Sequence, residues 1–128
     1  MAKLRVAEVL SGRVKDMNEG MIERIDRETG KAKIVYVPCF SLNTIMSALN
    51  KIHVDYFSLD VEGSELDVLN GIDHNRIMID TFTIEHNGYV DLKKSIVLQL
   101  EGKGFIKLKE DTQDVYFKKN STIVSNKL

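Results

Sequence analysis

A strand–helix–strand pattern over residues 54–85 constrains the fold of this chain more than any other feature. Val54–Val61 is a short, mostly apolar run, which is typical of a strand buried in a parallel sheet. Ser64 then opens a capping-box pattern for a short helix, and Gly71 is placed where such a helix ends. Ile77–Glu85 is a second apolar run that predicts a neighbouring strand. The spacing therefore predicts a right-handed βαβ unit and an α/β fold.

The segment before this unit predicts further strands and one helix. Residues 3–10 and 20–25 alternate weakly between apolar and polar side chains, and Lys33–Val37 alternates more strongly. We expect the last two segments to form a hairpin around the polar turn between them. Apolar residues then recur at three- and four-residue spacing as far as Ile52, behind an N-cap at Ser41. This spacing predicts an amphipathic helix of about three turns.

The segment after the unit predicts a helix and a closing pair of strands. Residues 91–100 carry a helical apolar stripe that is stopped by two glycines. Residues 105–109 and 115–118 predict a strand pair around a polar turn. We expect residues 1–118 to form a single domain and residues 119–128 to form a flexible tail.

Length, charge and the single cysteine exclude several classes of protein. A chain of 128 residues is long enough for one domain with a hydrophobic core and too short for a two-domain enzyme. Residues 34–92 hold two basic and nine acidic residues, which is a poor surface for nucleic acid. Cys39 has no disulfide partner, and we expect it to be packed rather than reactive. No apolar run approaches the roughly 20 residues of a membrane span. We therefore expect a cytoplasmic protein without nucleic-acid or membrane partners.

Polar residues follow the two predicted parallel strands, at the edge where ligands bind in open α/β sheets. Asp60 and Glu62 end the first strand on the same side, and Gly63 lets the backbone turn sharply into the helix. Glu85–Gly88 ends the second strand with a carboxylate, an imidazole, an amide and a glycine. Adjacent strands, about 4.8 Å apart, would bring these side chains together. Carboxylates held so close favour general-base chemistry or a divalent cation.

Each of these residues also has a purely structural interpretation. Asp60 could cap the following helix, Glu62 could favour the positive end of that helix, and Glu85 could pair with a lysine. We favour a site because both clusters are present together. The other two histidines, His53 and His74, lie near predicted helix ends without metal-ligand spacing, so we expect them at the surface or as caps.

Residues 54–72, VDYFSLDVEGSELDVLNGI, carry a specific pattern in which a buried strand ends in D-x-E-G and the next helix carries E-L-x-V-L-x-G. This pattern strongly resembles the FkbM family of S-adenosylmethionine (SAM)-dependent methyltransferases. Residues 37–50 and 83–88 are similar to the family's segments before that strand and at the end of the next one. The resemblance therefore covers about residues 34–118, and it extends to the Star-like animal members of the family.

The resemblance implies a Rossmann-like class I methyltransferase sheet and the transfer of a methyl group from SAM to a hydroxyl of a sugar or another small molecule. It implies that Asp60 and Glu62 line the methyl-transfer cleft, and Glu85 at the end of the next strand is a further candidate catalytic residue. It also makes His86 the candidate base for the acceptor hydroxyl. By looser analogy with catechol-type O-methyltransferases, Asp60 with Glu85 or Asn87 could bind a divalent metal.

The same resemblance leaves two interpretations of the chain. Residues 1–33 lack the family's glycine-rich cofactor turn, so residues 1–118 look like a single partial methyltransferase domain whose sheet is truncated at its N-terminus. Asp60 and Gly63 are the nearest candidates for cofactor contacts. The chain is either a methyltransferase or a catalytically inactive module that binds partners, or a second copy, through an exposed sheet edge. An enzyme should bind SAM in the micromolar range. We expect weak or no binding by this chain alone and activity in a longer form, and a longer Star-like parent would place it in the secretory pathway.

Overall fold

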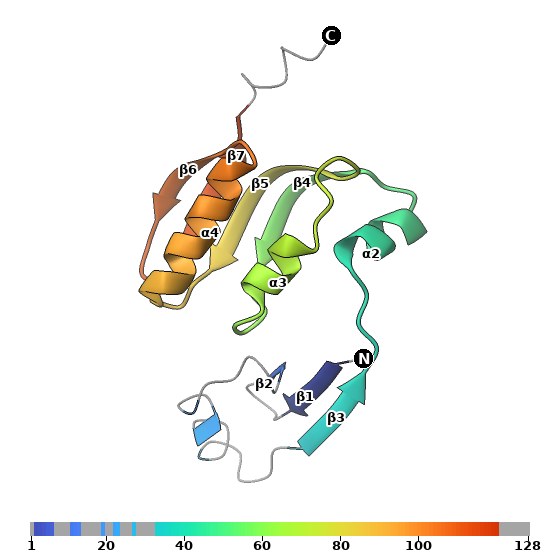
Figure 1. Cartoon of the computed structure of the whole chain (residues 1–128), viewed down its shortest axis with the longest axis vertical. Helices are drawn as coiled ribbons and strands as arrows, with labels where there is room; N and C mark the ends of the chain where they lie inside the picture. Colours follow the sequence, from blue (N-terminus) through green and yellow to red (C-terminus); the bar gives the residue numbers. More distant parts are fainter. Residues whose placement is uncertain are drawn as a thin grey trace. The chain divides into compact units, whose positions relative to one another are not determined.

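The computed structural model describes residues 2–6, 11–13, 19, 22–23, 27 and 33–120. It divides into two compact units, coloured along the chain in Figure 1. The first unit spans residues 1–40 and 61–64, and the second spans residues 41–60 and 65–128.

The first unit contains a three-stranded antiparallel sheet. Its strands are β1 (Ala2–Val6), β2 (Ser11–Arg13) and β3 (Lys33–Val37), in the order β2-β1-β3. Strand β3 has the predicted bounds, but it pairs with β1, with Leu4 opposite Val35.

The predicted hairpin between residues 20–25 and β3 is wrong. Ile22 and Glu23 are helical, as is Arg27 in the predicted turn, and the rest of residues 20–32 lies outside the described residues. The apolar residues Met21 and Ile25 are four positions apart, a spacing that suits a helix better than a strand.

The second unit is an α/β unit built around a four-stranded sheet. Its elements, in chain order, are α2 (Leu42–Ala48), β4 (His53–Leu59), α3 (Glu65–Asn70), β5 (Met78–Glu85), α4 (Val90–Gly102), β6 (Phe105–Glu110) and β7 (Asp114–Lys119). The strand order is β4-β5-β7-β6, in which β4 and β5 are parallel and the other pairs antiparallel. The predicted parallel strand–helix–strand unit, the helix over 91–100 and the closing strand pair are confirmed.

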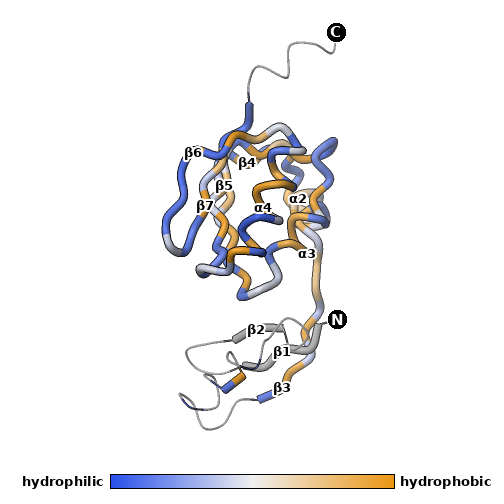
Figure 2. Tube along the Cα trace, turned by 60° about the vertical axis from the view of Figure 1, so that its left-hand side comes forward, coloured by the Kyte–Doolittle hydropathy of each residue, from blue (hydrophilic) through white to orange (hydrophobic). Residues whose placement is uncertain are grey.

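The core of the second unit lies between its sheet and helices α3 and α4, which share one face of the sheet in Figure 1. Phe82 of β5 is at its centre, because its ring makes edge-to-face contacts with Phe57 of β4 and Phe105 of β6 at centroid distances of 5.6 and 5.2 Å. The buried apolar residues around it are Leu59, Leu69, Ile84, Ile96, Leu100, Val115 and Phe117. Figure 2 shows the hydrophilic turn between β6 and β7.

Local polar contacts set the ends of the shorter helices. The Ser41 hydroxyl accepts a hydrogen bond from Thr44 N at 3.1 Å, which confirms the predicted N-cap of α2. This helix ends at Ala48, before the predicted residue 52, because Asn50 takes a left-handed conformation with φ 52°. Gly71 directly follows α3, and its N–H donates to Asp67 O and Val68 O.

The C-terminal boundary differs slightly from the prediction. Lys119 is the last residue of β7 rather than the first residue of a tail, and residues 121–128 lie outside the described residues. The Rossmann-like class, the N-terminal truncation and the single partial domain over residues 1–118 stay predictions. None of the helices in the described ranges is long and apolar enough to cross a membrane.

Candidate functional site

The carboxyl ends of β4 and β5 meet at one edge of the sheet. The strands are parallel, and Leu59, the last residue of β4, is the register partner of Ile84. Asp60 therefore follows β4 at the level where Glu85 ends β5. Sequence reasoning placed both residues correctly, because the bounds of the two apolar runs also fix the ends of the strands.

Three carboxylates converge at this edge and form what we call the carboxylate cluster: Asp60, Glu65 and Glu85. One oxygen of each lies within 4.8 Å of the others. Glu65 is the first residue of α3 and only 1% exposed, whereas Glu85 is partly buried and Asp60 is exposed. Carboxylate oxygens gathered at one point can bind a divalent cation or accept hydrogen bonds from hydroxyl groups.

Glu65 was not predicted as a site residue, although the signal was present. It is the first glutamate of the E-L-x-V-L-x-G helix that carries the family resemblance, and it opens α3 directly after the turn that follows β4. Sequence reasoning treated the residue as part of a helix-start pattern. The tertiary structure gives it a second role, because α3 lies over the sheet and turns this side chain inward.

Glu62 and Gly63 form the turn that leads from β4 into α3. Both take left-handed backbone conformations, with φ 50° and 94°, which is costly for Glu62 and free of strain for Gly63. These two residues belong to the first compact unit, whereas Asp60, Glu65 and Glu85 belong to the second. The roles predicted for Glu62 in catalysis and for Gly63 beside the cofactor stay predictions.

His86 is buried directly after β5, with 2% of its surface exposed. Its Nδ1 accepts a hydrogen bond from Gly88 N at 3.1 Å, so the hydrogen of the neutral ring is on Nε2. Within the described residues Nε2 has no hydrogen-bond partner. As a base at Nδ1, His86 would have to release the Gly88 N–H. The predicted role of His86 stays a prediction.

Asn87 was the predicted amide ligand of a metal. It is exposed, its φ is 48°, and its N–H donates to Gln113 O at 3.1 Å. The structure thus places Asn87 in the tight turn after β5, anchored to the β6–β7 turn. A metal-binding role for this residue stays a prediction.

The remaining candidates from the sequence fall elsewhere. His53 is exposed at the start of β4 and His74 is half-buried with its ring on Phe105, 5.8 Å between centroids. Cys39 is exposed, so the predicted packing of this residue is wrong. Residues 38–40 follow β3 without regular structure and are all exposed, so this segment does not bury the thiol.

Comparison with known proteins identifies the family. The family model for the methyltransferase FkbM domain matches residues 7–114. Searches of curated proteins and of solved structures gave no match. The match includes the strand end, the helix and the second strand end that hold the carboxylate cluster. The chain therefore belongs to the FkbM methyltransferase family.

Proposed function

We propose that this chain is a SAM-dependent methyltransferase that methylates a hydroxyl group of a small molecule or sugar. The observation that carries the proposal is the carboxylate cluster at the carboxyl ends of two adjacent parallel strands, in a chain of the FkbM family. Ligands bind at this edge in open α/β sheets. The parallel pair with its crossover helix is also the local topology that a Rossmann-like methyltransferase sheet requires.

The family match also supports binding of the cofactor by this chain. The resemblance in the motifs begins near residue 34, but the family model matches from residue 7. The upstream segment is therefore part of the same family domain, although it lacks the expected glycine-rich turn. We therefore infer that this chain itself binds SAM.

The carboxylates would act as the base for the acceptor. SAM supplies an electrophilic methyl group on a sulfonium and leaves as S-adenosylhomocysteine (SAH). The acceptor hydroxyl loses its proton as its oxygen bonds to the methyl carbon, and a carboxylate of the cluster takes that proton. Glu65 is buried at the start of α3 and holds the carboxylate cluster in place. Asp60 is exposed and passes the proton to water.

His86 fits a positioning role within the same proposal. Its Nδ1 holds Gly88 N–H, and its backbone N donates to Gln113 O at 2.7 Å. These contacts fix the turn that follows Glu85 and so restrict the carboxylate at the end of β5. In this role His86 acts through Glu85 and does not itself take the acceptor proton.

The donor set of the cluster also fits a divalent cation. Mg²⁺ and Mn²⁺ prefer carboxylate oxygens, and a cation there would polarise the acceptor oxygen as a Lewis acid. Titration calorimetry with Mg²⁺ or Mn²⁺ should give a heat that disappears in Asp60→Ala. No heat at millimolar cation would rule out metal binding at the carboxylate cluster and leave its carboxylates to act as bases without a metal.

Methyl transfer itself tests the proposed chemistry. The protein is incubated with methyl-labelled SAM and a panel of monosaccharides and aliphatic alcohols, and labelled products are counted. Glu85→Gln should lose transfer by about 100-fold or more, the usual contribution of a positioned base. Asp91→Asn is the matched control, because Asp91 is an exposed carboxylate at the start of α4. Equal rates in Glu85→Gln and the wild type would contradict the proposal.

One observation favours the alternative, an inactive interaction module. Strand β4 is an edge strand of the four-stranded sheet, and Tyr56 on it is 58% exposed. An edge of this kind can pair with a second copy of the chain. Sedimentation at increasing concentration tests it: a dimer that Tyr56→Lys dissociates, in a protein without methyl transfer, would favour the module.

A further inference from the structure

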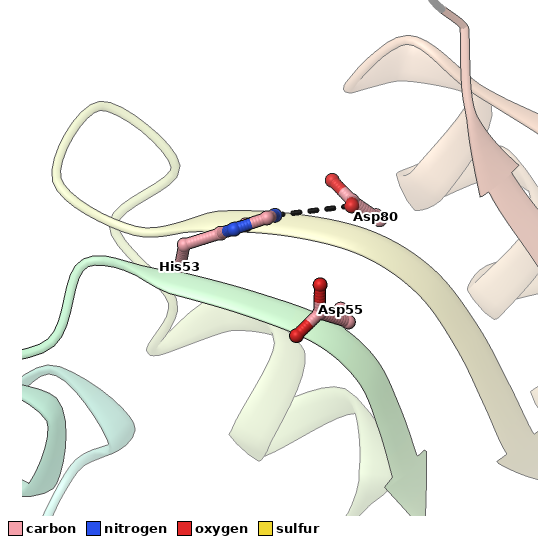
Figure 3. A group of neighbouring side chains, drawn as sticks. All are labelled: His53, Asp55 and Asp80. Carbon is pink, nitrogen blue, oxygen red and sulfur yellow. Dashed lines mark ion pairs between the residues drawn. The ribbon is translucent and has the colours of Figure 1, made fainter.

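A second group of ligating side chains lies at the opposite end of β4 and β5 from the carboxylate cluster. We call it the His53 cluster: His53 and Asp55 of β4, and Asp80 of β5 (Figure 3). Residues 56–59 of β4 lie between Asp55 and Asp60, so the two clusters are about 16 Å apart at about 3.3 Å per residue. The His53 cluster therefore has no part in the proposed methyl-transfer chemistry.

Strand register brings the three side chains to one face. His53 and Asp55 are two positions apart, so they point to the same side of β4. Val54 pairs with Ile79 and Tyr56 with Thr81, which places Asp55 level with Asp80 on the neighbouring strand. The cluster is thus fixed by two hydrogen-bonded strands rather than by a loop.

The distances fit a shared ion. His53 Nε2 lies 3.0 Å from Asp80 Oδ2, and the ligating atoms of all three residues lie within 4.8 Å of one another. Two ligands bound to one tetrahedral Zn²⁺ at about 2.1 Å are themselves about 3.4 Å apart. A small adjustment of the three side chains would therefore complete a coordination site.

Charge balance is the second argument. Like charges at level positions of adjacent strands destabilise a sheet, and Asp55 faces Asp80 in this way. The hydrogen bond from His53 compensates Asp80, but the Asp55 carboxylate has no hydrogen bond or ion pair within the described ranges. With a neutral imidazole the cluster carries two negative charges, which one divalent cation would cancel.

We propose that His53, Asp55 and Asp80 bind a first-row divalent metal ion such as Zn²⁺, with water completing the coordination. An imidazole with two carboxylates is a ligand set for Zn²⁺ rather than for Mg²⁺, which prefers oxygen ligands and retains its waters. All three side chains are exposed, so water can complete the coordination. The bound ion would tie the edge strand β4 to β5.

The simpler interpretation is a surface ion pair between His53 and Asp80 alone. Such a pair explains the 3.0 Å contact, but it gives no role to Asp55. Asp55→Asn separates the two interpretations, because it removes one carboxylate ligand and keeps the contact between His53 and Asp80. A surface pair keeps its contact between His53 and Asp80 after this change, whereas a metal site loses one of its three ligands.

The test is a titration of the chelator-treated protein with Zn²⁺, followed by NMR of the histidine rings and by calorimetry. One equivalent of Zn²⁺ should shift the ring signals of His53 and leave those of His74 in place. Asp55→Asn should weaken this binding by at least about tenfold, the lower end of what even an outer-sphere partner contributes. Mg²⁺ at the same concentration should leave the His53 signals unchanged.

Two variants control for other effects. Asp91→Asn removes an exposed carboxylate from α4, and Glu85→Gln alters the carboxylate cluster, so both should keep the Zn²⁺ response of His53. Unfolding of Asp55→Asn in the presence of chelator shows whether the variant is folded. The proposal is overturned if Zn²⁺ does not shift His53 at one equivalent, or if folded Asp55→Asn binds as tightly as the wild type.

Discussion

Two histidines of the second unit lie in opposite electrostatic surroundings. The hydrogen bond that His53 donates to Asp80 raises the pKa of His53, and the charge of Asp55 adds to this effect. Burial lowers the pKa of His74, and the nearby charges of Lys119 and Lys103 lower it further. The same residue type thus favours the charged form at one end of the sheet and the neutral form beside the core.

NMR titration in the presence of a chelator should resolve the two rings. We expect His53 to titrate above pH 6.5 and His74 below it, and Asp80→Asn to lower the pKa of His53 only. The contribution of His53 to the stability of the fold is fully present at pH values below the pKa of His53 in the unfolded chain. It is lost as the pH rises through the pKa of His53 in the folded protein. His74 acts in the opposite direction, because the folded state loses stability as pH falls below 6.5 towards its folded pKa. Titration of His74 above His53 would contradict these assignments.

Phe82 should be the most sensitive core position. Its side chain is 1% exposed and makes contacts with the rings of Phe57 and Phe105, so Phe82→Ala leaves a cavity that its neighbours cannot fill. We expect a loss of about 3–5 kcal/mol in the free energy of unfolding, measured with urea. Leu98→Ala is the control, because Leu98 on α4 is 76% exposed and should change little. Similar losses in the two variants would show that the core lies elsewhere.

The ends of the elements depend on single backbone conformations. Gly88 has φ 76°, so Gly88→Ala should destabilise the protein by roughly 1–2 kcal/mol. Gly102 ends α4 without a left-handed φ, and a Cβ added there would meet nothing within 4 Å, so Gly102→Ala should stabilise the protein by about 0.4–1 kcal/mol. Thermal unfolding of both variants tests these two predictions. If Gly88→Ala were more stable than Gly102→Ala, the left-handed conformation of Gly88 in the turn after β5 would be contradicted.

Periodicity predicted the elements of the second unit well because their side chains are sorted between core and solvent. The apolar runs of β4 and β5 and the stripe of α4 each gave the element within a few residues. The first unit was harder to predict, since β3 pairs with β1, more than 25 residues away in sequence. Propensity carries no information about such a partner, and residues 20–25 matched a strand by alternation alone.

The positions of two candidate site residues could be predicted because they follow from topology. Parallel strands end at one edge, so Asp60 and Glu85 were found from the sequence. Glu65 and the His53 cluster were not, because the first depends on how α3 lies over the sheet and the second on the register between β4 and β5. The packing of α3 on the sheet and the register between two strands are tertiary features, and residue spacing within one strand does not predict them.

At the scale of the whole molecule, the central proposal is that the chain binds SAM at the carboxyl ends of its parallel strands β4 and β5. Titration calorimetry with SAH is the decisive measurement, because it needs no knowledge of the acceptor. We predict a saturable heat for one site, weakened in Asp60→Asn and unchanged in Asp91→Asn. A Kd of about 1 mM corresponds to a binding free energy of only about 4 kcal/mol. If SAH gives no heat up to about this concentration, the proposal is contradicted and an inactive, partner-binding domain is favoured.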